Sequence, residues 1–112
     1  MDGLTIMVAP NGARRMPADH PALPVTVPAI ARACAEVHAL GAQAVHVHVR
    51  DREGRHCLDV GLYQALTDAI RAEAGPRLIV QATTEAVGRF TPAEQIALVR
   101  TLRPEAVSIA LK

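Results

Sequence analysis

Two histidines separated by one residue, His46 and His48, have the spacing and side-chain type of a metal-binding pair. Side chains at positions i and i+2 of a β-strand point to the same side, so a strand here would make the two imidazoles neighbours. Neutral imidazoles are common ligands of Zn2+ or another divalent metal, with further ligands supplied elsewhere. The alternative is a pair of half-buried structural histidines. Their position at the C-terminal end of an apolar run, followed by Arg50 and Asp51, favours the metal.

A second group of candidates lies in the long segment 11–26, which has no helical pattern. Connections of this length in a compact domain are often functional. Asn11 opens the segment and is expected to contact a substrate. Arg14 and Arg15 follow, and their forked donors suit a carboxylate or a phosphate. We expect Arg14 to act in catalysis, although solvated loop arginines are the alternative.

The remaining candidates follow the second, third and fourth apolar runs. Thr83 carries a hydroxyl that could hydrogen-bond a substrate carboxylate or oxyanion, although threonine is also a common strand residue. Arg50 could neutralise a substrate carboxylate, and His56 lies close to the expected site. Ser108 lies in the last run and has no evident base partner for nucleophilic catalysis. We expect Arg50, His56 and Ser108 to contact the substrate.

The elements that would position these groups alternate along the chain. Apolar runs rich in β-branched residues predict strands over 4–9, 44–49, 78–82 and 106–111. Helical patterns lie between them, beginning at Pro28, after Asp59 and after the capping box that starts at Thr91. Alternation of this kind predicts parallel strands joined by right-handed crossovers, which is an α/β fold.

The spacing of the units suggests a barrel. The predicted strands begin about 28 to 40 residues apart, close to one eighth of a (β/α)8 barrel of typically ~250 residues. We therefore expect residues 1–112 to be the N-terminal part of a single (β/α)8 TIM-barrel domain. Its polar strand ends would meet on one face. Its two open sheet edges would require partners, so a homo-oligomer is expected.

Composition excludes several classes of function. Twelve Lys and Arg against eleven Asp and Glu give a net charge of +1, and the sequence has one Tyr, one Phe and no Trp. Neither an electrostatic footprint nor stacking platforms for nucleic acid are present. The sequence has no apolar run of about 20 residues and no signal-peptide pattern at its start, so we expect a cytoplasmic protein without a membrane partner.

Six segments together resemble the β-keto acid cleavage enzymes, a family that includes the 3-keto-5-aminohexanoate cleavage enzyme of lysine fermentation. The segments are 9–15, 18–26, 46–51, 54–56, 81–89 and 103–108. The resemblance implies a zinc-dependent (β/α)8 barrel that converts a β-keto acid and acetyl-CoA into acetoacetate and a new acyl-CoA. The metal would act there as a Lewis acid on the keto and carboxylate oxygens.

Carried over by residue, the resemblance places the metal pair on His46 and His48. It places a strand hydroxyl on Thr83, where a serine is usual. A glutamate ligand and a catalytic arginine and aspartate would come from later strands, outside these 112 residues. The best-known member has an acidic residue where this sequence has Arg14, so a substrate without an amino group is expected. Two alternatives remain: a non-catalytic half barrel or assembly domain, and another metal-dependent aldolase or hydrolase.

Overall fold

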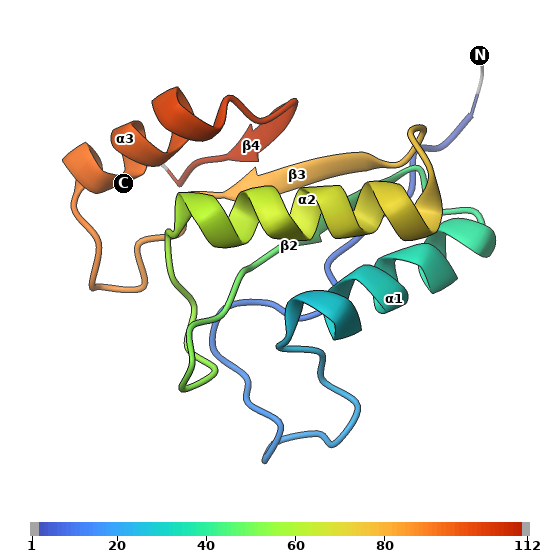
Figure 1. Cartoon of the computed structure of the whole chain (residues 1–112), viewed down its shortest axis with the longest axis horizontal. Coiled ribbons are helices and arrows are strands. Elements are labelled where there is room, and N and C mark those ends of the chain that lie inside the picture. The colour runs from blue at the N-terminus through green and yellow to red at the C-terminus, as the bar shows by residue number, and fades with distance from the viewer. Residues whose placement is uncertain (1–2, 111–112) are drawn as a thin grey trace.

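The chain folds into a four-stranded parallel sheet with helices between the strands, in a computed structural model that describes residues 3–110 (Figure 1). The elements in order are β1 (Met7–Val8), α1 (Val27–Ala39), β2 (Ala44–Val47), α2 (Val60–Ala74), β3 (Ile79–Thr83), α3 (Pro92–Leu102) and β4 (Ala106–Ser108). Neighbours in the sheet are also neighbours in sequence, in the order β1-β2-β3-β4. The α/β prediction is confirmed, and the arrangement is that of half a (β/α) barrel.

The strands at the two edges are shorter than the sequence predicts. The predicted strands 4–9 and 106–111 reduce to Met7–Val8 and Ala106–Ser108, and residue 111 lies outside the described residues. An edge strand has only one neighbour to complete its backbone hydrogen bonds. Before β1, Ile6 N instead donates to the side chain of Gln43 at 2.6 Å.

The central strands differ from their predicted ranges by one or two residues. The ladder of β2 stops at Val47 rather than Val49 because a side chain takes the next backbone positions. Asn11 Nδ2 donates to His48 O at 2.7 Å, and His48 N donates to Asn11 Oδ1 at 3.3 Å. The third strand is Ile79–Thr83 instead of 78–82.

Each helix begins at the cap that its sequence predicts. Thr26 accepts from the backbone at the start of α1, and Asp59 does so at the start of α2. At α3, Thr91 and Glu94 form a reciprocal capping box, with Pro92 in the first turn. None of the helices described within residues 3–110 is long and apolar enough to cross a membrane.

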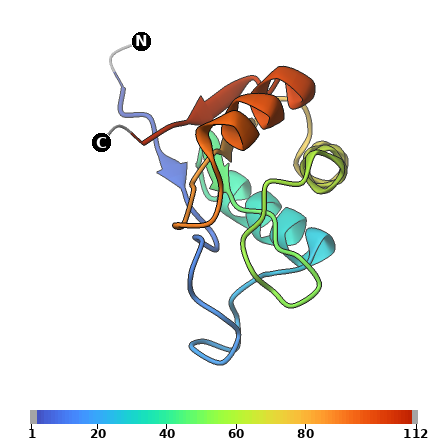
Figure 2. The same cartoon turned by 90° about the vertical axis from the view of Figure 1, so that its left-hand side faces the viewer.

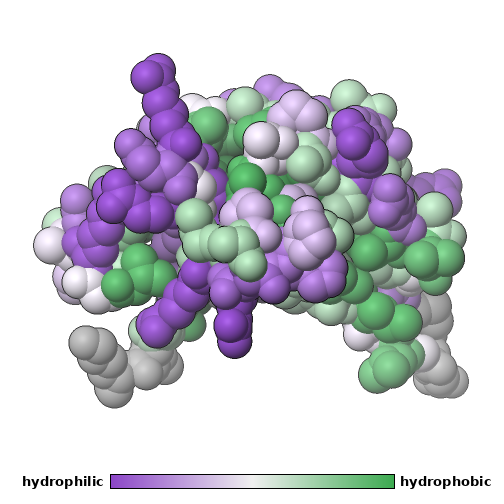
Figure 3. Space-filling model, turned by 90° about the horizontal axis from the view of Figure 1, so that it is seen from below, coloured by the Kyte–Doolittle hydropathy of each residue, from purple (hydrophilic) through white to green (hydrophobic). Residues whose placement is uncertain are grey.

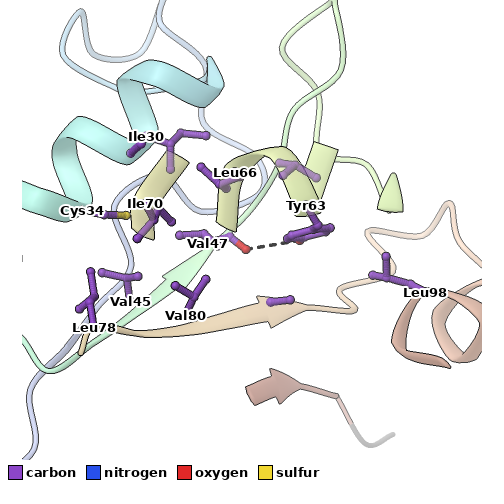
Figure 4. Packing of buried hydrophobic residues seen from close by; sticks show 13 residues of the cluster. Ile30, Cys34, Val45, Val47, Tyr63, Leu66, Ile70, Leu78, Val80 and Leu98 are labelled. Atoms are coloured by element: carbon purple, nitrogen blue, oxygen red, sulfur yellow. Dashed lines mark hydrogen bonds between the residues drawn. The ribbon is translucent and has the colours of Figure 1, made fainter. Parts of the chain in front are cut away.

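One face of the sheet is covered by helices and forms the hydrophobic core (Figures 2 and 4). Val45 and Val47 of β2 point to this side and are fully buried, as the alternation predicts. Helices α1 and α2 supply most of the facing side chains, with the Tyr63 hydroxyl 3.3 Å from Val47 O. The chief members of this cluster are Ile30, Cys34, Val45, Val47, Tyr63, Leu66, Ile70, Leu78, Val80 and Leu98.

The opposite face of the sheet is not covered by a helix. Met7, Ala44 and Ile79 are register partners on this face, and Met7 and Ile79 are 45% and 42% exposed. The next layers along the strands contain polar side chains. Other large apolar side chains are exposed too, and Figure 3 shows hydrophobic areas beside the hydrophilic ones on one side of the molecule. This inner face corresponds to the interior of a barrel.

Glu105, just before β4, forms hydrogen bonds with β3 and α2. We predict that this contact is sensitive to acid. Its Oε1 accepts from Val80 N at 2.8 Å and from the Arg71 guanidinium at 2.5 Å. Burial raises the pKa of Glu105, but these hydrogen bonds and the Arg71 charge outweigh burial, and the net pKa is lowered. A lowered pKa in the folded state means that the stabilisation is present above the unfolded-state pKa and is lost as pH falls through the folded one.

We expect the unfolding free energy of Glu105→Gln to fall less steeply than that of the wild type as the pH drops below about 5. Urea unfolding at a series of acid pH values measures this. Glu73→Gln, on the exposed side of α2, is the matched control and should leave the acid dependence as in the wild type. An unchanged acid dependence in Glu105→Gln would contradict the assignment.

Candidate metal centre

His46 and His48 are neighbours on the inner face at the carboxyl end of β2, as their spacing predicts. Their Nε2 atoms face each other at 3.1 Å, with ring centroids 4.8 Å apart. His48 is buried, with 3% of its surface exposed, and His46 is half-buried. The valines that alternate with them lie in the core on the other face, so the sheet holds both imidazoles in place.

The outer nitrogens of both rings have partners that define where the hydrogens lie. His46 Nδ1 lies 2.6 Å from Gln81 Oε1, and an amide oxygen only accepts. On the other side, His56 Nε2 donates to the carbonyl oxygen of Glu85 at 2.8 Å. The Nδ1 of a neutral His56 is then an acceptor, 3.4 Å from His48 Nδ1, which donates to it. Both Nε2 atoms between the two rings are consequently left without hydrogens.

The surroundings of His48 favour its neutral form. Its pKa is lowered to about 3, chiefly by burial and also by the neighbouring His56, His46 and Arg50. Burial also lowers the pKa of His56. The Glu85 carboxylate is 3.8 Å from His48 Nδ1. With the pKa of His48 so low, this contact is not an ion pair at neutral pH.

Two facing lone pairs at 3.1 Å suit a shared cation. Zinc binds imidazole nitrogen at about 2.0–2.1 Å, so two nitrogens on one tetrahedral ion lie roughly 3.3 Å apart. The pKa of His48 keeps it neutral, as a metal ligand must be, and the outer nitrogens of both rings have hydrogen-bond partners. The donor set therefore fits Zn2+ or another divalent metal. Within residues 3–110, no group of three His, Cys, Asp or Glu side chains could hold the ion alone.

Two predicted hydroxyl residues meet beside the histidines. Thr83 and Ser108 are register partners on β3 and β4, and Ser108 Oγ donates to Thr83 Oγ1 at 3.0 Å. Glu85 N also donates to Thr83 Oγ1, at 3.1 Å. Among the described residues, no acceptor takes the hydrogen of the Thr83 hydroxyl. That hydrogen is suited to a bound oxygen atom.

Asn11 and Arg50, both predicted to contact substrate, brace the first loop against β2. The side-chain amide of Asn11 donates to the carbonyl oxygen of His48 and accepts from its backbone N–H. The Arg50 guanidinium is buried and donates to four carbonyl oxygens, those of Asn11, Gly12, Arg15 and Gly54, at 2.7 to 3.1 Å. All four terminal hydrogens of Arg50 are therefore used within the chain. Substrate contact by either residue stays a prediction.

We expect Arg50→Met to release the first loop. The substitution keeps much of the side-chain volume but leaves four carbonyl oxygens without their charged donor, so a loss on the order of 3 kcal/mol in unfolding free energy is expected. Urea unfolding measures the loss, and limited trypsin digestion at Arg14 and Arg15 reports the loop. Arg52→Met, at an exposed position next in the same turn, is the control. Wild-type stability and cleavage rates in Arg50→Met would refute the bracing role.

Comparison with known proteins identifies the family. The chain matches the family described as beta-keto acid cleavage enzyme over residues 4–112. The chain belongs to this family. It is 33% identical over 96 residues to the 3-keto-5-aminohexanoate cleavage enzyme of Fusobacterium nucleatum, which covers 86% of this chain and 35% of that protein. It is 32% identical over 109 residues to the enzyme of the same name from Acetoanaerobium sticklandii, covering 97% of this chain and 39% of the relative.

A third relative has another name. The 3,5-dioxohexanoate:acetyl-CoA acetone transferase of Paraburkholderia graminis is 31% identical over 105 residues, covering 93% of this chain and 33% of that protein. The chain thus spans between one third and two fifths of the curated relatives it matches. The sequence resemblance to β-keto acid cleavage enzymes is confirmed.

Arg14 lines a basic cavity together with His56. The cavity, of about 380 Å³, is also lined by Arg55 and Arg89. Arg55 and Arg89 approach the Asp51 carboxylate at 3.7 and 3.9 Å. Arg14 is exposed and takes part in none of the ion pairs found among residues 3–110. Its charge is therefore available to a ligand.

The structure adds two residues to the site that were not selected from the sequence. Gln81 bonds His46, and Glu85 bonds His56 through its carbonyl oxygen. A signal for Gln81 was present in its spacing, because Gln81 and Thr83 stand two apart on one strand and share its inner face. A carbonyl oxygen carries no residue-specific signal, so the role of Glu85 could only be found in three dimensions.

Proposed function

We propose that this chain provides the metal-binding strands of an enzyme that converts a β-keto acid and acetyl-CoA into acetoacetate and an acyl-CoA. The supporting observation is that the Nε2 atoms of His46 and His48 face each other at 3.1 Å at the carboxyl end of β2. The names of all three relatives contain a β-keto acid, and the third also contains acetyl-CoA.

Each side chain of the site has a separate proposed role. His46 and His48 would hold Zn2+ or another divalent ion, which as a Lewis acid polarises the keto and carboxylate oxygens of the substrate. Thr83 donates its hydroxyl hydrogen to a substrate carboxylate or oxyanion, and Ser108 orients that hydroxyl. His56 accepts the hydrogen bond from His48 Nδ1. It also lines the cavity that contains Arg14, where it can contact the substrate tail.

A chimera tests the activity. Residues 4–112 are joined to the remaining part of the Acetoanaerobium sticklandii relative, and acetoacetate formation is measured with acetyl-CoA and a panel of β-keto acids. The expected result is turnover that depends on added zinc or another divalent metal and is lost in a chimera carrying Thr83→Val. A soluble, folded chimera that binds metal but forms no acetoacetate from any β-keto acid would refute the proposed reaction.

Arg14 is predicted to select the substrate tail. Its unpaired charge in this cavity disfavours a cationic tail and favours a neutral or anionic one. In the chimera, Arg14→Glu is expected to shift the ratio of kcat/KM values toward 3-keto-5-aminohexanoate by roughly tenfold or more, since a charge-assisted hydrogen bond contributes about 1.5–3 kcal/mol. Arg15→Glu in the same loop is the control. A chimera with Arg14 that prefers the cationic tail would contradict the prediction.

A non-catalytic half barrel is the second candidate. The observation that favours it is the exposed inner face, where Met7 and Ile79 of the apolar layer remain accessible. An assembly domain would use this face and the edges of β1 and β4 for a partner chain. Such a protein would neither retain metal nor support turnover in the chimera, whereas another metal-dependent aldolase or hydrolase would retain metal without using acetyl-CoA.

A further inference from the structure

Gln81 occupies a place in the sheet that the proposed reaction does not use. It is the register partner of His46 on the neighbouring strand β3, and both side chains lie on the inner face. Gln81 is half-buried, and its Oε1 lies 2.6 Å from His46 Nδ1. The two residues are separated by 35 positions in sequence, so their contact depends on the β2–β3 register.

The chemistry of this contact decides which nitrogen of His46 carries hydrogen. A neutral imidazole has one N–H and one lone pair, and the hydrogen bond made by one nitrogen selects the role of the other. The Gln81 oxygen accepts, so Nδ1 holds the hydrogen and Nε2 presents its lone pair toward His48. With the opposite tautomer, an N–H would stand between the two rings and no metal could bind Nε2.

The two histidines are held in different ways. His48 is fixed through its backbone by Asn11 and through its ring by His56. His46 has Gln81 as the partner of its outer nitrogen, and its own backbone lies within the β2 ladder. The orientation of the His46 ring therefore depends on Gln81 more than that of His48 depends on any single side chain.

We propose that Gln81 is a positioning residue that holds His46 with its hydrogen on Nδ1 and its Nε2 ready to bind the metal. This inference rests on the proposed metal site for its consequence, but the tautomer itself is a property of the metal-free chain. Outer partners of metal-bound histidines typically change metal affinity by 10–100-fold when they are removed.

The test uses the 112-residue chain and zinc alone, without substrate. Long-range proton–nitrogen NMR of the metal-free chain, at a pH above the ordinary imidazole pKa of about 6.5, reports which His46 nitrogen carries hydrogen. Zinc affinity is measured by competition with a coloured chelator. The wild type is expected to show hydrogen on Nδ1. Gln81→Leu should lose this preference and bind zinc 10–100-fold more weakly.

Two further variants separate positioning from a general loss of structure. Gln81→Glu also presents an acceptor to Nδ1 and should restore both the tautomer and the zinc affinity. Gln95→Leu removes a glutamine that donates to Thr84 O at 2.5 Å, and it should lower stability without changing the His46 tautomer. Gln95 is half-buried like Gln81, so it is a matched control.

The outcomes distinguish this inference from the proposed function. Wild-type tautomer and zinc affinity in Gln81→Leu would overturn the role of Gln81 and leave the metal site intact. A Gln81-dependent tautomer, with no zinc bound by either the chain or the chimera, would support the role of Gln81 in holding the ring and would refute the proposed metal site.

Discussion

Zinc binding is expected to fall by more than about 100-fold when either His46 or His48 is replaced by alanine. Each ring supplies one of the two Nε2 atoms that face each other at 3.1 Å, so a single substitution leaves one imidazole without its partner. Loss of an outer hydrogen-bond partner alone costs about 10–100-fold, and loss of a ligand should cost more. Elemental analysis after dialysis, with chelator competition for the affinity, measures the effect.

Folding and specificity controls accompany this prediction. His20→Ala removes an exposed histidine of the first loop and should leave zinc content unchanged. Circular dichroism should show that the His46 and His48 variants stay folded, since the helices and core lie on the other face of the sheet. Because His48 is buried, His48→Gln provides a second variant of closer volume. Equal zinc in the wild type and the double alanine variant would refute the metal site.

Complete loss of turnover is expected when residues 1–112 are assayed alone. Catalytic zinc normally has three protein ligands. Within residues 3–110 only the two histidines are placed to bind it, because no group of three suitable side chains occurs there. Acetoacetate formation is measured with zinc, acetyl-CoA and a panel of β-keto acids, at the concentrations that support turnover by the chimera. The chain alone should show no rate above the uncatalysed background.

The same chain is expected to self-associate. The edges of β1 and β4 expose backbone donors and acceptors, and Leu4 and Ile109 beside them are 83% and 68% exposed. Sedimentation velocity should therefore show species larger than one chain. A monomer with steady turnover would contradict both parts of the prediction, because it would show that the site and the sheet are complete without further strands.

The alternating architecture could be predicted from the sequence because its signals are local. Hydrophobic periodicity separates strands from helices, and a cap such as Asp59 acts within three or four residues of its own position. The inward direction of His46 and His48 follows from their i, i+2 spacing as soon as the strand is known. The edge strands were predicted too long because their length depends on the strands that pair with them in the sheet, and local sequence patterns do not report this pairing.

Tertiary structure decided which polar groups act together. His46 bonds Gln81 across 35 positions, Thr83 meets Ser108 across 25, and both contacts depend on the register of parallel strands.

The partners of Arg50 could not be predicted from the sequence either, because an arginine suits a substrate carboxylate as well as it suits backbone carbonyls. Its four carbonyl partners come from two loops that approach it only in the folded chain. The sequence by itself determined the α/β order, the helix starts and the face on which the histidines lie, because these depend on neighbours along the chain. The partners of each side chain were decided by folding, because a hydrogen bond requires a distance and an angle that only the register and the loop paths provide.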